Sequence, residues 1–374
     1  MLKYFSVRNF KNFSDTITLD LRAGRYIFNK ENDHNGILKN SIIYGYNACG
    51  KSNLALALFD IVASVTDKWF DASKYLNYQN VHHQNTPAEF SYCFVFGDNE
   101  LVYSYQKANW QSTLTETLTI NGKTMLVFNR QTGKLQQSFA GAESLDPHIA
   151  NPSLAAVKYI RANASLDPHS KDNQVFLSFC KFVDGMLLFW CLQDRSYVGY
   201  ETGRADLFTA ICNEDHLARY NEFLQDMSID RRIVARRMPD GTILPYYDFG
   251  NNHLLPYQGS TMSNGESSLM LFFYWLVEIE DKQSPSLVFI DEFDAFYHIR
   301  LSRKLMRMLQ ERINGQVILT THNDTLISNE ILRPDSYFFL KNNRIQAFDK
   351  IAGKEIREAH NLRRMFDAGV FDPE

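Results

Sequence analysis

The chain has 374 residues, of which 45% are hydrophobic and 22% are charged, an ordinary balance for a globular protein. Its formal net charge of -4 gives no overall electrostatic reason to expect nucleic acid or an anionic membrane as a partner. Five scattered cysteines form no CxxC pair, which argues against a zinc site and fits a reducing compartment. The first residues form no apolar signal segment, so we expect a cytoplasmic protein.

In chain order, the N-terminal part is rich in strand patterns. The stretches "LKYFSVRNF" and "DTITLDLRA" alternate between apolar and polar residues, and residues 41–44 form a short apolar run. Residues 88–128 read as hairpins with Gly-Asp-Asn and Asn-Gly turns. The apolar spacing becomes helical from about 170 to 228, and a turn-rich connection follows at 238–252. The two most apolar stretches, 175–192 and 269–279, are broken by charge or too short to span a bilayer, and we expect both to be buried helices.

A phosphate-binding loop is predicted from Gly45 to Ser52, in the sequence "GYNACGKS". The alternative is a glycine turn that carries a lysine by chance. A buried strand precedes the motif and a Leu- and Ala-rich helix follows it, which is the context that a P-loop requires. The glycines turn backbone N–H groups toward phosphates, Lys51 adds a positive charge, and the Ser52 hydroxyl can bind Mg²⁺. Cys49 is expected to be a tolerated small residue rather than a reactive thiol.

Three polar signals cluster in the last third of the chain. Ser263 starts a Ser-Asn-Gly-Glu turn before an apolar helix, which is either an anion-binding helix start or a simple capping box. Asp291 and Glu292 follow a buried strand, where they could hold Mg²⁺ and activate water, although two adjacent structural carboxylates are also possible. His322 ends another apolar strand, where it could contact a γ-phosphate or be structural.

The order of these motifs resembles the ATP-binding-cassette head of SMC and RecF proteins: P-loop, long insertion, signature turn, Walker B acids, switch histidine. It is closer still to bacterial stand-alone OLD-like, RecF-like ATPases, as seen in "VRNFKNFSD", "YGYNACGKSNL" and "IDEFDAFYH". The resemblance covers roughly residues 1–130 and 245–345. It implies an α/β fold, a P-loop NTPase of the ABC/SMC-head type with a mixed core sheet, an antiparallel β subdomain and a helical insertion.

The resemblance also implies the site. ATP would be held by the P-loop and signature residues Gly45, Asn47, Ala48, Cys49, Gly50, Lys51, Ser52, Asn53, Ser263, Asn264 and Gly265. Mg²⁺ would be held by Ser52 and Asp291, and the catalytic residues would be Lys51, Glu292 and His322. Asp294 and His298 would lie in the segment that crosses the dimer seam, and two chains would sandwich two ATP molecules.

The sequence departs from the family in two places. Its signature reads Met-Ser-Asn-Gly-Glu where Leu-Ser-Gly-Gly is commoner, and the glutamine that links nucleotide to the helical arm is not identifiable, with Gln84 as a candidate. The expected domains are an N-terminal ATPase lobe at 1–165, a helical insertion at 166–240 and a C-terminal ATPase lobe at 241–374. This insertion is too short for a long coiled coil, which argues against a tethering SMC machine.

Compact ATPases of this type are similar to the ATPase subunits of anti-phage defence systems such as PARIS and Septu. The resemblance therefore implies an Mg-dependent ATPase that works as a sensor for a separately encoded nuclease or toxin. A RecF-like DNA repair clamp is the alternative, because two basic sets could contact phosphates. They comprise Arg231, Arg232, Arg236 and Arg237, and then Arg300, Arg303, Lys304 and Arg307. A binding module with an inactive ATPase site is disfavoured, since Lys51, Asp291, Glu292 and His322 are all present.

Overall fold

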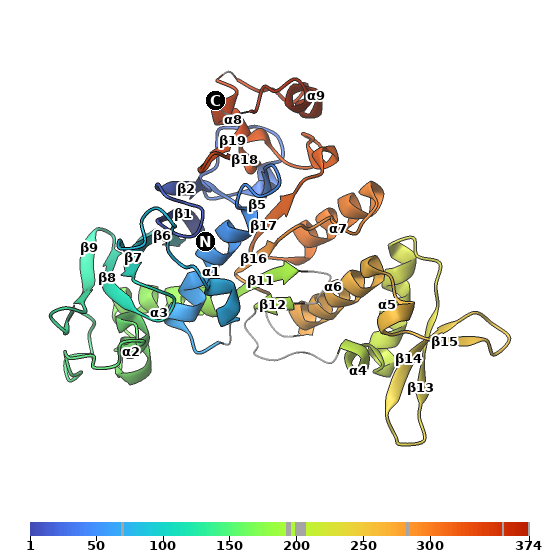
Figure 1. Cartoon of the computed structure of the whole chain (residues 1–374), viewed down its shortest axis with the longest axis horizontal. Helices are drawn as coiled ribbons and strands as arrows, with labels where there is room; N and C mark the ends of the chain where they lie inside the picture. Colours follow the sequence, from blue (N-terminus) through green and yellow to red (C-terminus); the bar gives the residue numbers. More distant parts are fainter. Residues whose placement is uncertain (69–70, 192–195, 199–206, 282–283, 354, 373–374) are drawn as a thin grey trace.

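The structure is a computed structural model and describes residues 1–68, 71–191, 196–198, 207–281, 284–353 and 355–372. Two large sheets lie on either side of one helix, and a third, smaller sheet projects from the body (Figure 1). No helix in these ranges is long and apolar enough to cross a membrane.

The core sheet has seven strands and brings distant parts of the chain together. Its strands, in spatial order, are β12 (Ser196–Val198), β11 (Met186–Cys191), β16 (Leu287–Ile290), β17 (Gln316–Thr321), β5 (Asn40–Tyr44), β18 (Tyr337–Lys341) and β19 (Arg344–Ala347). The five central strands are parallel, and the two edge strands are antiparallel to their neighbours. Because parallel strands end at the same edge, β5, β16 and β17 deliver the loops that follow them to one place.

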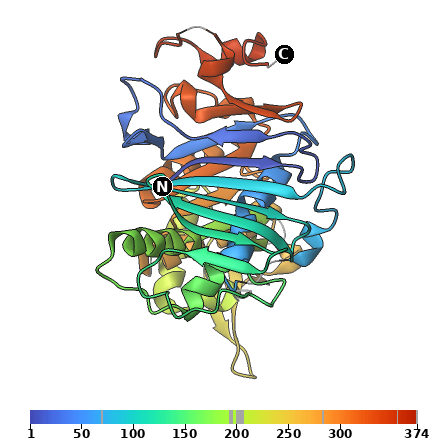
Figure 2. The same cartoon turned by 90° about the vertical axis from the view of Figure 1, so that its left-hand side faces the viewer.

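The second sheet is antiparallel throughout, and Figure 2 shows its blue to teal strands lying side by side. Its order is β10 (Lys134–Gln137), β9 (Lys123–Asn129), β8 (Thr113–Ile120), β7 (Asn99–Lys107), β6 (Ala88–Phe96), β1 (Leu2–Arg8) and β2 (Ile17–Asp20). The hairpins predicted within 88–128 are confirmed as β6–β7 and β8–β9. A two-stranded ribbon, β3 (Asp33–His34) with β4 (Ile37–Leu38), precedes the core strand β5.

The helix α1 (Lys51–Val65) lies between the two large sheets. Strand β5 shows why: Ile43 belongs to the hydrophobic cluster that contains α1, while Ile42 and Tyr44 belong to the cluster on the opposite face. This alternation follows from the two-residue period of a strand buried on both faces. On the α1 side lie α2 (Ala156–Asn163) and α3 (Lys171–Asp184).

The opposite face of the core sheet is covered by the remaining helices. These are α4 (Leu207–Ile211), α5 (Glu214–Asp226), α6 (Asn264–Asp281), α7 (Ile299–Arg312), α8 (Phe348–Ile351) and α9 (Leu362–Asp367). The third sheet joins β13 (Ile233–Arg237), β14 (Ile243–Asp248) and β15 (Leu254–Pro256). The expected buried helix at 269–279 is confirmed by α6, where residues 269–273 are buried.

The predicted fold class is confirmed, but one expected helix is wrong in part. Residues 175–192 do not form a single helix: α3 ends at Asp184, Gly185 follows, and the chain continues as β11. Strand β11 pairs in parallel with β16, so residues 186–191 of the expected insertion belong to the core sheet. An apolar run buried on both sides has no period that separates helix from strand, which explains the error. Residues 192–195 and 199–206 of the expected insertion lie outside the described ranges.

Candidate functional site

The loop from Gly45 to Ser52 connects β5 to α1, as the sequence predicted. Ala48 and Gly50 have φ angles of 62° and 106°, so the backbone turns back on itself before the helix. Gly50 is the N-cap residue of α1, and no side chain in the described part of the protein caps the free N–H groups there. The first turn of α1 therefore presents uncapped donors and the positive end of the helix dipole to a ligand.

Both glycines of the motif are required by close neighbours. A Cβ atom at Gly45 would lie 2.7 Å from the carbonyl oxygen of Leu340 in β18. A Cβ atom at Gly50 would collide with the side-chain amide of Asn12, which comes from the turn between β1 and β2. Asn12 also accepts a hydrogen bond of 2.7 Å from Asn53 Nδ2. The loop shape is thus fixed by the core sheet on one side and by the antiparallel sheet's turn on the other.

Lys51 is buried, and its ammonium group has only uncharged partners among the described residues. Its Nζ donates to the carbonyl oxygens of Gly45 at 2.9 Å and Tyr46 at 3.2 Å, and lies 3.4 Å from His322 Nδ1. Burial lowers the pKa of Lys51 from its ordinary value. A buried cation held by neutral carbonyls fits a polyphosphate, because the anion would supply the missing negative charge.

Ser52 and Asp291 meet although 239 residues separate them in the sequence. The Ser52 hydroxyl donates to Asp291 Oδ2 at 2.5 Å, and the Thr320 hydroxyl donates to Asp291 Oδ1 at 2.6 Å. Burial raises the pKa of Asp291, and these two hydrogen bonds oppose that rise. One hydroxyl and one carboxylate are hard oxygen donors, and they fit the small number of protein ligands that Mg²⁺ takes beside phosphate and water.

Glu292 and His322 complete the cluster at the ends of β16 and β17. The backbone of Glu292 is left-handed, with φ 48°, and its N–H donates to Thr320 Oγ1 at 2.8 Å. Its carboxylate is exposed and lies 3.9 Å from His322 Nε2. Burial and the nearby charge of Lys51 lower the pKa of His322, which favours its neutral imidazole. An unusual backbone conformation at an exposed acid is typical of a functional site.

The predicted signature residues lie at the start of α6, and there they form a capping box. Glu266 N–H donates to Ser263 Oγ at 3.2 Å, while Ser263 N–H donates to Glu266 Oε2 at 3.0 Å. Gly265 lies close to the segment after β16, because a Cβ atom there would be 3.2 Å from Phe296 O. Among the described residues, no hydrogen bond or ion pair joins Ser263, Asn264 or Gly265 to the P-loop cluster.

The predicted residues of the segment after β16 lie in two different environments. Asp294 is buried and accepts a hydrogen bond of 2.6 Å from Thr321 Oγ1 at the end of β17, within the same chain. His298 is exposed and caps α7 by accepting from Arg300 N–H at 3.4 Å. Gln84 borders a separate hollow with Tyr78 and Asn109, and none of the predicted nucleotide residues lines that hollow.

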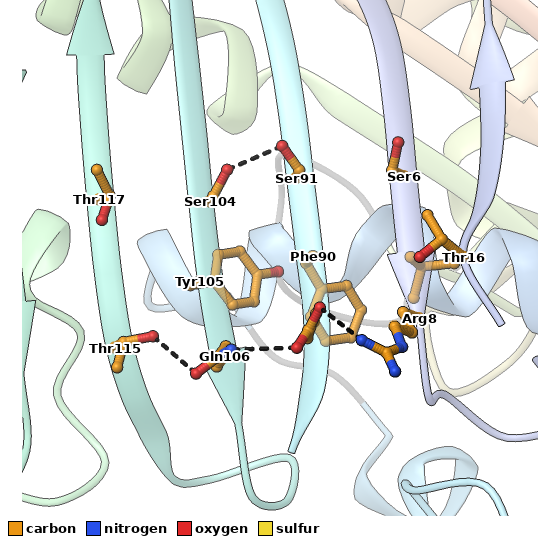
Figure 3. A pocket seen from close by; sticks show the side chains of 12 residues that line it. Ser6, Arg8, Thr16, Phe90, Ser91, Ser104, Tyr105, Gln106, Thr115 and Thr117 are labelled. Atoms are coloured by element: carbon orange, nitrogen blue, oxygen red, sulfur yellow. Dashed lines mark hydrogen bonds and ion pairs between the residues drawn. The ribbon is translucent and has the colours of Figure 1, made fainter. Parts of the chain in front are cut away.

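A groove of about 340 Å³ lies on the outer face of the antiparallel sheet (Figure 3). Its side chains bond to one another across the strands: Ser91 to Ser104 at 2.8 Å, and Gln106 to Glu89 at 3.2 Å. None of the predicted site residues borders this groove. It is the polar, self-bonded outer face of a sheet whose other face packs on α1.

Two residues that contact the cluster were not predicted from the sequence. Thr320 bonds to both Asp291 and Glu292, and the polar pair at the end of "QVILTT" was the available signal. Asn12 donates a hydrogen bond of 3.3 Å to the P-loop carbonyl of Cys49, and no local pattern in "FKNFSD" announces that contact.

Comparison with known proteins finds a family model that matches part of the chain and several solved structures of low sequence identity. A family model described as "AAA domain, putative AbiEii toxin, Type IV TA system" matches residues 193–328. No curated protein matches the sequence. Among solved structures, an SMC head bound to the C-winged helix domain of ScpA is 12% identical, covers 94% of this chain and 99% of its own, and has a TM-score of 0.49.

Two further SMC heads are similar to the chain. The SMC head domain from Thermotoga maritima is 14% identical, covering 92% of this chain and 97% of its own with a TM-score of 0.43. The SMC head with an extended coiled coil, bound to the C-terminal domain of ScpA derived from Pyrococcus furiosus, is 11% identical, covering 93% and 97% with a TM-score of 0.48. The assignment of a P-loop NTPase fold rests on the strand order and the loop geometry described above.

Proposed function

We propose that the chain is an Mg-dependent ATPase that converts ATP and water to ADP and phosphate. One observation carries this proposal: β5, β16 and β17 bring Lys51, Ser52, Asp291, Glu292 and His322 together from three distant parts of the sequence. Such a convergence at the carboxyl edge of a parallel sheet is where α/β proteins bind ligands.

The residues divide the work by their chemistry. Lys51 and the uncapped N–H groups of α1 would hold the phosphates, and Ser52 with Asp291 would hold Mg²⁺. When bound, Mg²⁺ neutralises charge on the phosphate oxygens. Glu292 would orient the attacking water and accept its proton, since its carboxylate is exposed beside the cluster. The neutral imidazole of His322 would donate a hydrogen bond to the terminal phosphate.

We further propose that the working form is a homodimer or a higher even oligomer. The start of α6 is a second helix N-terminus with the residues expected to contact phosphate, and among the described residues no hydrogen bond or ion pair links it to the P-loop of its own chain. A twofold arrangement would place Ser263, Asn264 and Gly265 of one chain against the nucleotide of the other. The site would then be complete only between two chains.

The biological role that we propose is that of a sensor subunit in a bacterial anti-phage defence system. The chain would control a separately encoded effector, either a nuclease or a toxin. The matched family model supports a link to toxin systems, because its description names an AbiEii toxin and a type IV TA system. A RecF-like DNA clamp is the second candidate, and the exposed arginines of β13 favour it.

Two experiments test this proposal at its two levels. Phosphate release by the purified chain, with and without Mg²⁺, tests the chemistry. We expect hydrolysis that is lost with EDTA and in Lys51→Ala, whereas hydrolysis that survives in Lys51→Ala would contradict the site. Co-purification with the product of a neighbouring reading frame tests the role. A nuclease or toxin that binds this chain supports defence, and a replication or repair protein in its place would overturn it.

A further inference from the structure

The hairpin β13–β14 projects from the body of the molecule in both views (Figures 1 and 2). Its strands pair from Ile233 with Tyr247 to Arg237 with Ile243. The third strand, β15, pairs only with residues 246–248. The outer part of the hairpin, from about residue 236 to 244, is therefore a two-stranded ribbon that stands free of the sheet.

This ribbon carries a local positive charge on a chain whose net charge is -4. Segment 230–250 holds four arginines and three aspartates, which gives +1 (4 − 3). The arginines are all exposed, and among the described residues none forms an ion pair with a carboxylate; they are Arg231, Arg232, Arg236 and Arg237. Two of the aspartates are engaged in turns, because Asp240 accepts from Thr242 N–H at 2.9 Å and Asp248 accepts from Gly250 N–H at 2.9 Å.

The guanidinium groups make only weak contacts with their surroundings. Arg236 donates to Asn252 Oδ1 at 3.2 Å, and Arg231 lies over the exposed ring of Phe249 at 5.5 Å. The second basic set, on α7, differs: Arg303 donates to Thr325 O at 2.9 Å, and Lys304 donates to Asp226 O. Two members of the α7 set thus donate to backbone carbonyl oxygens of the body, while the side chains of the exposed ribbon arginines bond to no backbone carbonyl among the described residues.

The two-residue period of a strand places Arg236 and Arg237 on opposite faces of the ribbon. A ribbon that enters a groove edge-on would thus present one cation to each wall. The major groove of B-form DNA is about 12 Å wide and about 8.5 Å deep and admits a two-stranded ribbon. Three residues of strand extend about 10 Å, so the free part of the ribbon is long enough to reach the groove floor.

We propose that the β13–β14 ribbon binds duplex DNA by entering its major groove, with Arg236 and Arg237 on the phosphates of the two strands. Asp240 at the tip would face base edges, where a carboxylate can accept from the amino group of cytosine. The deep, narrow major groove of A-form RNA excludes such a ribbon, so duplex RNA is the discriminating ligand. This inference does not depend on ATP hydrolysis.

The test measures binding of the full chain to a fluorescent DNA duplex and to an RNA duplex of the same sequence, over a range of salt. Each lost phosphate contact makes the negative slope of log K against log salt shallower by about 0.9. The double variant R236Q/R237Q should therefore have a slope shallower by about 2 and bind DNA roughly 60-fold more weakly at about 0.1 M salt. The matched control is R300Q/R307Q, which removes two exposed arginines from α7 and should leave the slope unchanged.

Three other results would each contradict the proposal. If the wild-type chain does not bind duplex DNA, the ribbon has another partner. If both double variants lose the same DNA affinity, binding depends on overall charge and not on the ribbon. RNA bound as tightly as DNA would exclude insertion into the major groove. Unchanged melting temperatures of both variants are required to show that the ribbon still folds, and single R236Q and R237Q variants replace the double variant if it does not.

Discussion

The two helix starts that the sequence predicted as phosphate-binding differ in one respect. Within the described residues, the start of α1 has no side-chain cap, and the partners of Lys51 beside it are carbonyl oxygens and an imidazole. The start of α6 is closed on itself by Ser263 and Glu266, and Tyr247 holds Glu266 Oε1 at 2.9 Å. The first is open to a ligand within one chain, whereas at the second the Ser263 hydroxyl and the Glu266 N–H already bond to each other.

This difference bears on how a site shared between two chains would assemble. The side of the site formed by α1 is preorganised by β5, β16 and β17, so under the proposed function a single chain would already bind nucleotide there. The side formed by α6 has to exchange part of its capping box for a ligand, which is favourable only when a second chain supplies that ligand in the right place. In the proposed dimer, a capped second helix start would therefore couple nucleotide engagement to dimer formation.

The first prediction, with the largest expected effect, concerns the buried ion pair that holds α1 in place. Asp60 on α1 is buried and accepts from Lys107 Nζ at 3.0 Å, Tyr78 at 2.8 Å and Tyr105 at 2.8 Å. Lys107→Met leaves Asp60 as a buried charge without its cation, which should lower the free energy of unfolding by about 3–5 kcal/mol. Urea unfolding measures this loss.

The control for that change is Lys123→Met. Lys123 pairs with Asp172 at 2.8 Å in a largely exposed position, and its loss should cost less than about 1 kcal/mol. If both variants lose the same stability, the buried pair does not anchor the P-loop helix.

The second prediction concerns ATP hydrolysis on the α1 side of the site. Glu292→Gln keeps the shape of the side chain but cannot accept a proton, so turnover should fall by at least about 10²-fold while Mg·ATP still binds. Single-turnover hydrolysis and nucleotide binding measure the two quantities separately. Glu311→Gln, on the exposed face of α7, is the matched control. Normal turnover in Glu292→Gln would remove that residue from its proposed role.

The third prediction, with the smallest expected effect, concerns the capping box at the start of α6. Glu266→Ala removes the reciprocal half of the capping box and should cost about 1 kcal/mol of stability. Glu266→Gln keeps an oxygen acceptor for Ser263 N–H and should cost much less. Urea unfolding of the two variants compares them, and equal losses would show that the hydrogen bond is not what stabilises the helix start.

The sequence predicted the α1 side better than the α6 side, and the reason is local. The P-loop is one contiguous segment flanked by a β-branched strand and a Leu- and Ala-rich helix, so spacing alone places Lys51 and Ser52. At Ser263, one pattern encodes both a capping box and an anion site, and the structure shows the box. The contact between Ser52 and Asp291 depends on the strand order, which no local pattern contains.

Strand β11 shows the same limit within the fold. Asp184-Gly185 is a local turn signal, but residues 186–191 after it are apolar at almost every position, so their periodicity does not separate a strand from a continued helix. Its pairing with β16 depends on residues about 100 positions later in the chain. The contact of Asn12 with the P-loop was missed for the same reason, because a turn between two strands reveals nothing about its distant neighbour.

The central claim is that each nucleotide site is shared between two chains, and mixing two inactive variants tests it most directly. Lys51→Ala damages the α1 side, and Ser263→Arg blocks the α6 side. In a mixed dimer, one shared site carries both changes and the other carries neither, so ATP hydrolysis should reappear and peak near equal proportions. Sedimentation must confirm that the subunits exchange. Activity that stays flat at every ratio despite exchange, or full activity of Ser263→Arg alone, would contradict the account.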